Sequence, residues 1–325
     1  MSTPPELSIA PELNPSPGQV DYDLDTALGA VVSIRTHVPD DAFTANILGT
    51  DRTGHGVVFG NRGLVLTIGY LVAEAEQIWV LDRAGNAVTG DVLAYDYETG
   101  FGLIQPLGRL SSVTPLELGS VAPLKVGDEV VFAGYGGRRQ ALRAQVAAIS
   151  EFAGYWEYLI DQALFTYPPH PYWGGAAVID PQGRLCAIGS LYLDHLLPGG
   201  AATAGNMSVP VDLLTPIMDE LLTYGRTLKP ARPWLGMFVS QIHDALVVAG
   251  VYENAPASPV VKTGDIVRAI AGVPVNELPT FFRQLWAYSP AGVEIPLTLE
   301  RDGRLVEVRI DSLDRRDFWK KPKLH

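Results

Sequence analysis

Residues 170–189, HPYWGGAAVIDPQGRLCAIG, have the form of a hydrolase nucleophile site. Their second half predicts a β-hairpin, because two apolar runs flank a turn at residues 181–183. Gly174 and Gly175 come just before the first run, where many hydrolases place a nucleophile. The residue before them is Trp173, whose indole offers only an N–H donor. The stretch therefore predicts the setting of a nucleophile without a side chain that can attack.

Other side chains that could do chemistry are scattered along the chain. The candidates are three histidines and three nucleophiles: His55, His170, His195, Ser190, Ser208 and Cys186. No arrangement of nucleophile, base and orienting group is legible among them. No His-x-x-x-His or Cys-x-x-Cys spacing indicates a metal site, and the glycine-rich run 134–139 lacks the Lys-Ser/Thr of a phosphate loop. We therefore predict no metal and no cofactor, and we interpret the histidines as structural or surface residues.

The composition predicts a globular chain that avoids nucleic acid. Its 325 residues are 47% apolar, enough for about two domains with their own cores. The net charge of −12 repels phosphate backbones. Charged residues make up 18%, below the roughly 25% of soluble domains, which indicates that a partner covers part of the surface. The single cysteine, Cys186, excludes an internal disulfide and lies in an apolar run that predicts burial.

The two ends of the chain differ in character. The N-terminal stretch lacks the basic and apolar segments of a secretory signal, and no apolar run approaches the roughly 18 residues that span a bilayer. We therefore expect a cytoplasmic protein without a membrane span. Residues 315–323 are basic and aromatic. They predict either a solvated terminus or a docking handle for an acidic partner or membrane surface.

The apolar pattern predicts two β-rich regions joined by a linker. Short apolar runs separated by turns indicate a barrel or sandwich in the first region. A helix at 211–224 follows, with Gly225 as its stop. In the second region, Asp302-Gly303 predicts a hairpin turn. The predicted segments are a flexible arm at 1–26, a first domain at 27–226, a linker at 227–232, a second domain at 233–313 and a tail at 314–325.

Several stretches, in order, resemble the motifs of one protease family. TGHGVVFGNRGLVLTIGYLVAEAEQIWV resembles GSGVV…G-x-ILTNNHVV…A-x-x-I-x-V, and DVLAYDYETGFGLIQP resembles V-x-x-x-D-x-x-TDLALLK. PLELGSVAPLKVGDEVVFAGYG, the hairpin at 170–189 and MSVPVDLL resemble three later motifs. These are motifs of the HtrA (Deg) family of trypsin-like serine proteases, and RPWLGMFV…LERDGRLVEV resembles the PDZ domain that follows there. The resemblance implies a mostly β fold: a trypsin-like double six-stranded β-barrel, a C-terminal helix and a PDZ domain.

The catalytic positions of that family hold other residues in this chain. Tyr70 stands where TNNHVV has its histidine, Gly100 where TDLAL has its aspartate, and Trp173 where GNSGG has its serine. A phenol with an ordinary pKa of about 10 is a poor base, and glycine cannot orient an imidazole. Pro171 replaces a glycine whose N–H serves the oxyanion hole, and proline has no N–H. The resemblance therefore implies an inactive homologue of a serine endopeptidase.

Two parts of the chain then become candidate binding surfaces. Trp173 either fills a disused cleft or forms an aromatic recognition surface with Tyr70. PDZ domains add an extended peptide to a sheet edge and hold its carboxylate with backbone N–H groups. By resemblance, this carboxylate loop is Trp234-Leu235-Gly236-Met237, and Phe238 begins the edge strand. The alternative is a vestigial groove that the chain itself occupies.

Three functions remain in play from the sequence. The leading hypothesis is a pseudoprotease that binds a protein or peptide through the PDZ groove or the disused cleft, as an adaptor, a chaperone-like module or a subunit of a larger complex. The second is a structural subunit of a multiprotein enzyme with a vestigial groove. The third is a serine-type endopeptidase with a rewired active site. Both a homo-oligomer and a hetero-complex are compatible with the sequence.

Overall fold

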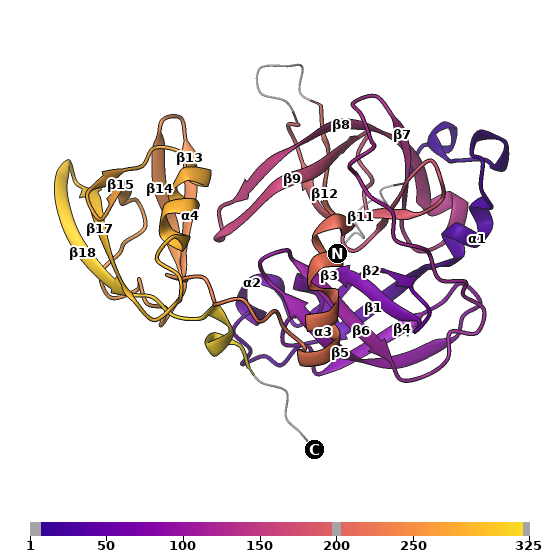
Figure 1. Cartoon of the computed structure of the whole chain (residues 1–325), viewed down its shortest axis with the longest axis horizontal. Helices are drawn as coiled ribbons and strands as arrows, with labels where there is room; N and C mark the ends of the chain where they lie inside the picture. Colours follow the sequence, from indigo (N-terminus) through magenta and orange to yellow (C-terminus); the bar gives the residue numbers. More distant parts are fainter. Residues whose placement is uncertain (1–7, 197–202, 321–325) are drawn as a thin grey trace, which may run out of the picture. The chain divides into compact units, whose positions relative to one another are not determined.

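The computed structural model describes residues 8–196 and 203–320, which divide into two compact units (Figure 1). The first unit contains Met1–Ser150, Gln162–Thr227 and Lys320–His325. The second contains Glu151–Asp161 and Leu228–Trp319. Strands dominate both, which confirms the mostly β fold predicted from the sequence.

The first unit begins with a closed six-stranded barrel. Its strands are β1 (Val31–His37), β2 (Asp51–Phe59), β3 (Leu64–Ile68), β4 (Gln77–Leu81), β5 (Ala87–Asp96) and β6 (Phe101–Pro106). They follow the order β1-β2-β3-β6-β5-β4, and every neighbouring pair is antiparallel. β3 is buried at all of its positions, as its apolar sequence LVLTI requires. It leads directly to the turn that carries Tyr70.

A second closed barrel completes the trypsin-like pair. Its strands are β7 (Glu129–Ala133), β8 (Ala141–Gly154), β9 (Tyr158–Tyr167), β10 (Ala177–Ile179), β11 (Leu185–Leu193) and β12 (Gly205–Pro210), in the order β10-β11-β12-β9-β8-β7. Its core includes Phe132, Leu142 and Leu164, together with the thiol of Cys186. The burial of that cysteine among apolar side chains confirms the sequence prediction.

Short helical segments connect and flank the barrels. Their bounds are η1 (Pro11–Leu13), η2 (Pro17–Gln19), α1 (Leu24–Gly29), α2 (Ala45–Leu48), η3 (Gly69–Leu71), η4 (Gly137–Gln140), η5 (Val211–Leu213), η6 (Thr215–Ile217) and α3 (Met218–Tyr224). The continuous helix predicted at 211–224 is wrong. Pro216 disfavours the α conformation of its predecessor and lacks an N–H, so two 3-10 turns precede α3. Gly225 ends α3 as predicted, at a φ of +68°. Within the described residues, no helix is both long and apolar enough to cross a membrane.

Residues 8–23 pack against the first unit, although their proline content predicts a flexible arm. Ile9 and Leu13 lie against the core of the second barrel. The Asn14 side chain donates a hydrogen bond to the carbonyl of Ala141 at 2.9 Å. These apolar contacts and the hydrogen bond to the Ala141 carbonyl hold the arm in place. They are tertiary contacts, which the local sequence of the arm does not reveal. Residues 1–7 lie outside the described part of the chain.

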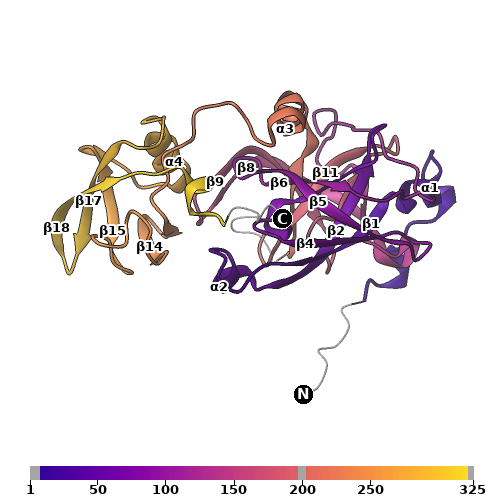
Figure 2. The same cartoon turned by 90° about the horizontal axis from the view of Figure 1, so that it is seen from below.

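The second unit is a small sheet with one helix. Its elements are β13 (Met237–Ile242), β14 (Ala245–Val251), β15 (Ile266–Ile270), β16 (Val273–Pro274), α4 (Leu278–Trp286), β17 (Glu294–Arg301), β18 (Arg304–Asp311) and η7 (Arg315–Phe318). The order is β13-β14-β15-β17-β18, with β16 beside β15, so β13 is an edge strand. Figure 2 shows α4 beside this sheet, and its Phe281, Phe282 and Leu285 are buried in the shared core. Asp302-Gly303 joins β17 to β18 at positive φ, which confirms the predicted hairpin.

Two further segments belong to the second unit. The β8–β9 tip (Glu151–Asp161) is placed by sequence in the first domain, yet its Ala153 and Leu159 pack against the core of the second unit. From the predicted tail, Arg315 is buried and the ring of Phe318 lies 4.8 Å from that of Trp234. Residues 315–319 are therefore a packed segment, not a solvated terminus, because their aromatic rings bury apolar area. Residues 321–325 lie outside the described part of the chain.

Candidate functional site

Tyr70 and Trp173 meet at the junction of the two barrels of the first unit. Tyr70 lies in η3, directly after β3, and its hydroxyl donates a hydrogen bond to the carbonyl of Ser190 at 3.0 Å. The Trp173 side chain hydrogen-bonds Tyr70, and since the indole N–H only donates, the phenol oxygen accepts. Burial raises the pKa of Tyr70 above its usual value. The phenol therefore stays protonated near neutral pH.

The loop that carries Trp173 is closely packed against β2. The carbonyl of Gly174 accepts from the N–H of His55 at 2.8 Å. A Cβ atom on Gly174 would lie 2.9 Å from the Tyr70 hydroxyl, and one on Gly175 would lie 1.9 Å from the His55 carbonyl oxygen. Trp173 itself is half-buried, with its ring 5.5 Å from that of Tyr192. The two glycines are thus tightly packed, and the half-buried indole of Trp173 lies directly before them.

Gly100 lies in the turn between β5 and β6 with a φ of +85°. Its N–H donates to the carbonyl of Asp96 at 2.8 Å, and its own carbonyl accepts from Gly69 at 2.6 Å. The second bond joins this turn to η3, the segment that carries Tyr70. A side chain at such a φ is strained, so the backbone here suits glycine. The position contributes a carbonyl to the turn and no carboxylate to Tyr70.

Two of the three candidate histidines lie where the barrels meet, His170 buried and His55 half-buried. His170 accepts from the N–H of Tyr172 at its Nδ1, at 3.0 Å, and its Nε2 lies 3.0 Å from the carbonyl oxygen of Gln140, to which it donates. Burial lowers the pKa of His170 to about 4. His55 accepts from the N–H of Tyr135 at its Nδ1, at 3.1 Å, and its pKa is lowered to about 4 by burial and by His170. Both rings are neutral near pH 7 and are committed to backbone groups.

The remaining candidates do not join a catalytic set. His195 is exposed after β11, while Ser190, Ser208 and Cys186 are buried. Burial raises the pKa of the Cys186 thiol, which donates to the carbonyl of Val178 at 3.3 Å. A thiol in this state is a packing group rather than a nucleophile. Across the described ranges, no three His, Cys, Asp or Glu side chains gather as a metal site would require.

The predicted carboxylate loop of the second unit holds a carboxylate. The N–H groups of Leu235, Gly236 and Met237 donate to Oε1 of Glu157 at 3.3, 2.8 and 3.3 Å. Gly236 has a φ of +74°, and a Cβ atom there would lie 2.3 Å from the Cβ of Ala255. Glycine is therefore needed for the loop to turn its amides toward one point. Trp234 is buried next to it.

Glu157 belongs to the β8–β9 tip and was not a sequence candidate. It is 7% exposed, and burial raises its pKa to about 7 even though Arg315 and the three amides act to lower it. Tyr155, two residues earlier, accepts at its carbonyl from the N–H of Val239 at 2.9 Å. Its ring lies 5.8 Å from that of Phe238. The only sequence signal for this contact is the cluster of aromatic residues in GYWEY, residues 154–158.

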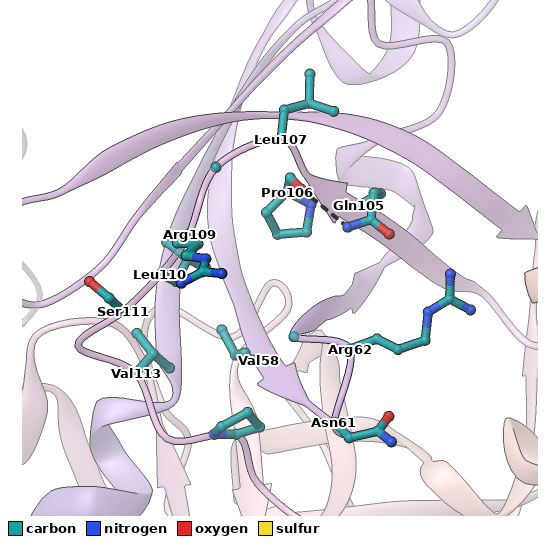
Figure 3. A pocket seen from close by; sticks show the side chains of 13 residues that line it. Val58, Asn61, Arg62, Gln105, Pro106, Leu107, Arg109, Leu110, Ser111 and Val113 are labelled. Atoms are coloured by element: carbon teal, nitrogen blue, oxygen red, sulfur yellow. Dashed lines mark hydrogen bonds between the residues drawn. The ribbon is translucent and has the colours of Figure 1, made fainter.

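A separate hollow of about 550 Å³ lies on the first barrel (Figure 3). Arg62, from the turn after β2, and Arg109, from the segment after β6, both line it. The Gln105 side chain in it donates to the carbonyl of Pro106 at 3.1 Å. None of Tyr70, Gly100 and Trp173 is among its lining residues. The hollow is thus distinct from the place where Tyr70 and Trp173 meet.

Two protein families match the chain over separate ranges. The trypsin-like peptidase domain matches residues 54–188, and the PDZ domain matches residues 233–311. These ranges contain, respectively, the Tyr70–Trp173 pair and the carboxylate loop.

Three named proteases are similar to this chain over most of its length. The chain is 22% identical over 292 residues to the serine protease Do-like HtrA of Lactobacillus helveticus, covering 81% of this chain and 69% of the relative. It is 24% identical to protease Do-like 1, chloroplastic, of Arabidopsis thaliana, covering 76% and 61%. It is 21% identical to the serine endoprotease DegS of Haemophilus influenzae, covering 81% and 77%. The chain therefore spans about two thirds of the length of these relatives.

Solved structures share the fold. The HtrA-type protease AlgW with a tripeptide superposes with a TM-score of 0.50 at 20% identity, covering 89% of this chain and 95% of that one. The serine endoprotease from Yersinia pestis gives a TM-score of 0.50 at 19% identity, covering 91% and 100%. With its trypsin-like peptidase domain followed by a PDZ domain, the chain belongs to the HtrA (Deg) family.

Proposed function

We propose that this chain is a catalytically inactive HtrA-type protein that acts by binding other protein chains. The observation that carries the proposal is the Trp173–Tyr70 pair, an indole and a phenol at the positions of the family's serine and histidine. Acyl transfer needs a nucleophile that an adjacent base activates. An indole that donates its N–H to a phenol oxygen supplies neither group.

The electrostatics around the pair also oppose catalysis. Burial raises the pKa of Tyr70, and its proton is held by the Ser190 carbonyl, so the phenol is not a base near pH 7. Gly100 offers no carboxylate to orient or charge a base. Pro171 removes a backbone donor that would stabilise an oxyanion, a contribution of about 3 kcal/mol. The base, the carboxylate that would orient it and one oxyanion donor, all of which amide hydrolysis uses, are thus missing under this proposal.

The binding half of the proposal rests on the second unit. Leu235, Gly236 and Met237 direct their amides toward a carboxylate, and β13 is the edge strand of its sheet. A strand edge next to a carboxylate-binding loop is the arrangement with which PDZ domains capture extended chain termini. We propose extended polypeptide segments as the partners, and a role as an adaptor or complex subunit.

The test is an activity assay on the full-length chain. Fluorescently labelled denatured casein and a serine-reactive phosphonate probe are offered to the wild type and to Trp173→Ala, with an active HtrA-type protease in parallel. We expect turnover at background and no covalent adduct for both proteins. Hydrolysis that coelutes with the chain in size-exclusion chromatography, together with a phosphonate adduct on one residue, would overturn the proposal of inactivity.

A further inference from the structure

The carboxylate loop of the second unit is already occupied by the chain. Oε1 of Glu157 accepts from three consecutive amides, at 2.8 to 3.3 Å, and Oε2 lies 3.3 Å from the Leu235 nitrogen. Consecutive N–H groups that converge on one point form an anion site. The occupant is a side chain carboxylate in place of a terminal one.

The backbone of the tip adds the second feature of a bound peptide. β13 pairs with β14 along one edge, while on its other side the N–H of Val239 donates to the Tyr155 carbonyl at 2.9 Å. A peptide that extends a sheet makes this kind of main-chain bond and presents its carboxylate at the end of the strand. The segment Tyr155–Glu157 makes both contacts within three residues.

The charges that face Glu157 favour an anion at this point. Arg315, from η7, is the charged neighbour, and its Nη1 donates to the carbonyl of Trp156 at 3.4 Å. Tyr252, which follows β14, hydrogen-bonds Arg315 and also faces Glu157. A cation beside three amides attracts a carboxylate from any source.

The tip is fixed to the second unit at its base, while its end is under strain. Arg283 of α4 pairs with Glu151 and, at 2.6 Å, with Asp161. Glu157 adopts a φ of +60°, which is costly for a residue with a side chain. The charge of Glu157 also loses hydration on burial. The cost of a positive φ does not apply to a chain terminus that enters in extended form, so an external carboxylate can compete.

We propose that Tyr155–Glu157 is an internal ligand of this groove, and that a polypeptide terminus with a free α-carboxylate is the external ligand that displaces it. The proposal deepens the proposed function, since it rests on the groove being a binding site for protein termini. A tethered occupant acts at an effective concentration of about a millimolar or more. The wild type should therefore bind external termini weakly, and removal of the Glu157 carboxylate should open the site.

The experiment measures peptide binding to the full-length chain by fluorescence anisotropy. The probe is fluorescein-labelled SEFAGYWA, which copies residues 150–156 and ends in an alanine with a free carboxylate. Its C-terminal amide serves as the second probe. The proteins are the wild type, Glu157→Ala, Glu157→Gly and the control Glu253→Ala, which removes the same charge from an exposed position of the same unit.

We expect Glu157→Ala to bind the acid probe about tenfold or more tighter than the wild type does. Glu157→Gly also removes the carboxylate, and glycine suits the φ of +60° at this position. It should therefore gain affinity as well, and it decides the question if thermal unfolding shows that Glu157→Ala is misfolded. Glu253→Ala should match the wild type, and the amide probe should bind all four proteins weakly. Equal affinity of the wild type and both Glu157 variants for the acid probe would overturn the inference, as would equal binding of acid and amide.

This outcome is separable from that of the activity assay. Casein hydrolysis with a gain of affinity in Glu157→Ala would refute inactivity and leave the internal ligand standing. Background hydrolysis without any carboxylate-dependent binding would refute the internal ligand and leave inactivity standing.

Discussion

The two candidate sites are both filled from within the chain, but what fills them differs. At the junction of the barrels, the Trp173 indole donates a hydrogen bond to the Tyr70 oxygen, and the Tyr70 hydroxyl donates one to the Ser190 carbonyl. In the second unit, Glu157 satisfies the amides of the carboxylate loop. Under the proposed function, the first filling stands at the positions of the family's catalytic side chains. The second leaves the recognition groups in place and only occupies them.

This contrast arises because catalysis depends on side chains, whereas carboxylate binding depends on the backbone. Catalysis by a serine protease depends on three side chains, so three substitutions remove it. Carboxylate capture depends on backbone N–H groups, which every residue except proline carries. A substitution at Leu235 or Met237 leaves the amide in place, and only the glycine at 236 is demanded by the turn. Under the proposed function, binding can therefore persist although the catalytic side chains are lost.

The largest effect is expected at Gly175, in the closely packed loop of the first site. A Cβ atom there would lie 1.9 Å from the His55 carbonyl oxygen and 2.6 Å from Thr67 Oγ1, at a φ of +76°. We expect Gly175→Ala to lower the free energy of unfolding by about 4 kcal/mol or more, because rigid backbone must move. Urea unfolding followed by near-UV circular dichroism measures the change.

Gly85→Ala is the matched control for Gly175→Ala. Gly85 also has a positive φ, +86°, but nothing lies within 4 Å of the added atom. Its cost should be the conformational strain alone, about 1–2 kcal/mol. If the two variants lost equal stability, the loop that carries Trp173 would not be tightly packed against β2.

A smaller effect is expected on acidification, and it should arise in the first unit. Burial lowers the pKa of His170 to about 4. A histidine whose pKa is lowered by folding contributes stability above its unfolded pKa of about 6.5, and that contribution is lost as the pH falls toward about 4. For His170 alone the loss amounts to about 3 kcal/mol. Urea unfolding at about pH 7.5 and about pH 4.5 measures it.

Two histidine variants distinguish this cause from general acid denaturation. His170→Gln should lose much of the pH dependence, since glutamine cannot take up the proton. His195→Gln changes an exposed histidine and should retain the dependence of the wild type. An unaltered pH profile in His170→Gln would contradict the assignment.

The second unit should respond to pH with the opposite sign. Burial raises the pKa of Glu157 to about 7 from its usual value near 4.5. Docking of the tip is therefore most stable below about pH 4.5 and weakens as the pH rises through about 7. Arg315 and Tyr252 also face Glu157, and burial raises the pKa of Tyr252 above its usual value, so this phenol does not titrate in this range. The acid probe should bind the wild type about tenfold tighter at about pH 8 than at about pH 6.

Glu157→Gln isolates the group responsible for that dependence. Because glutamine does not titrate, anisotropy titrations of this variant should give the same affinity at both pH values. Tighter binding to the wild type at the lower pH would show that the tip is docked through the ionised carboxylate, with the opposite linkage.

Local patterns predicted most of the fold. Alternating apolar runs and turn glycines mark the strands of both barrels, and Asp302-Gly303 marks its hairpin, because period and turn geometry are encoded within a few residues. The helix predicted at 211–224 failed where one residue, Pro216, outweighed the apolar spacing around it.

Local sequence patterns could not predict that the groove is occupied by Glu157. Glu157 and Gly236 are separated by 79 positions, and nothing in the local sequence of either indicates the other. The motif at 234–238 indicated where a carboxylate could bind, but its occupant is decided by tertiary packing of the β8–β9 tip. Likewise, Tyr70 and Trp173 were marked by their motifs, while their mutual hydrogen bond depends on how the two barrels meet.

The smallest expected effect is that of restoring the family's catalytic residues. Trp173→Ser returns a hydroxyl, but Tyr70 keeps its proton on the Ser190 carbonyl and cannot activate it. Adding Tyr70→His supplies a base without an orienting carboxylate. Adding Gly100→Asp places a side chain at a φ of +85°, where strain opposes the turn that positions η3. Pro171 still has no N–H to donate to an oxyanion in all three proteins.

We therefore expect casein hydrolysis at background for the single, double and triple variants, measured against an active HtrA-type protease. Efficient cleavage by Trp173→Ser alone would show that a base already faces position 173 and that the first site is closed by its indole only, as the second is closed by its carboxylate.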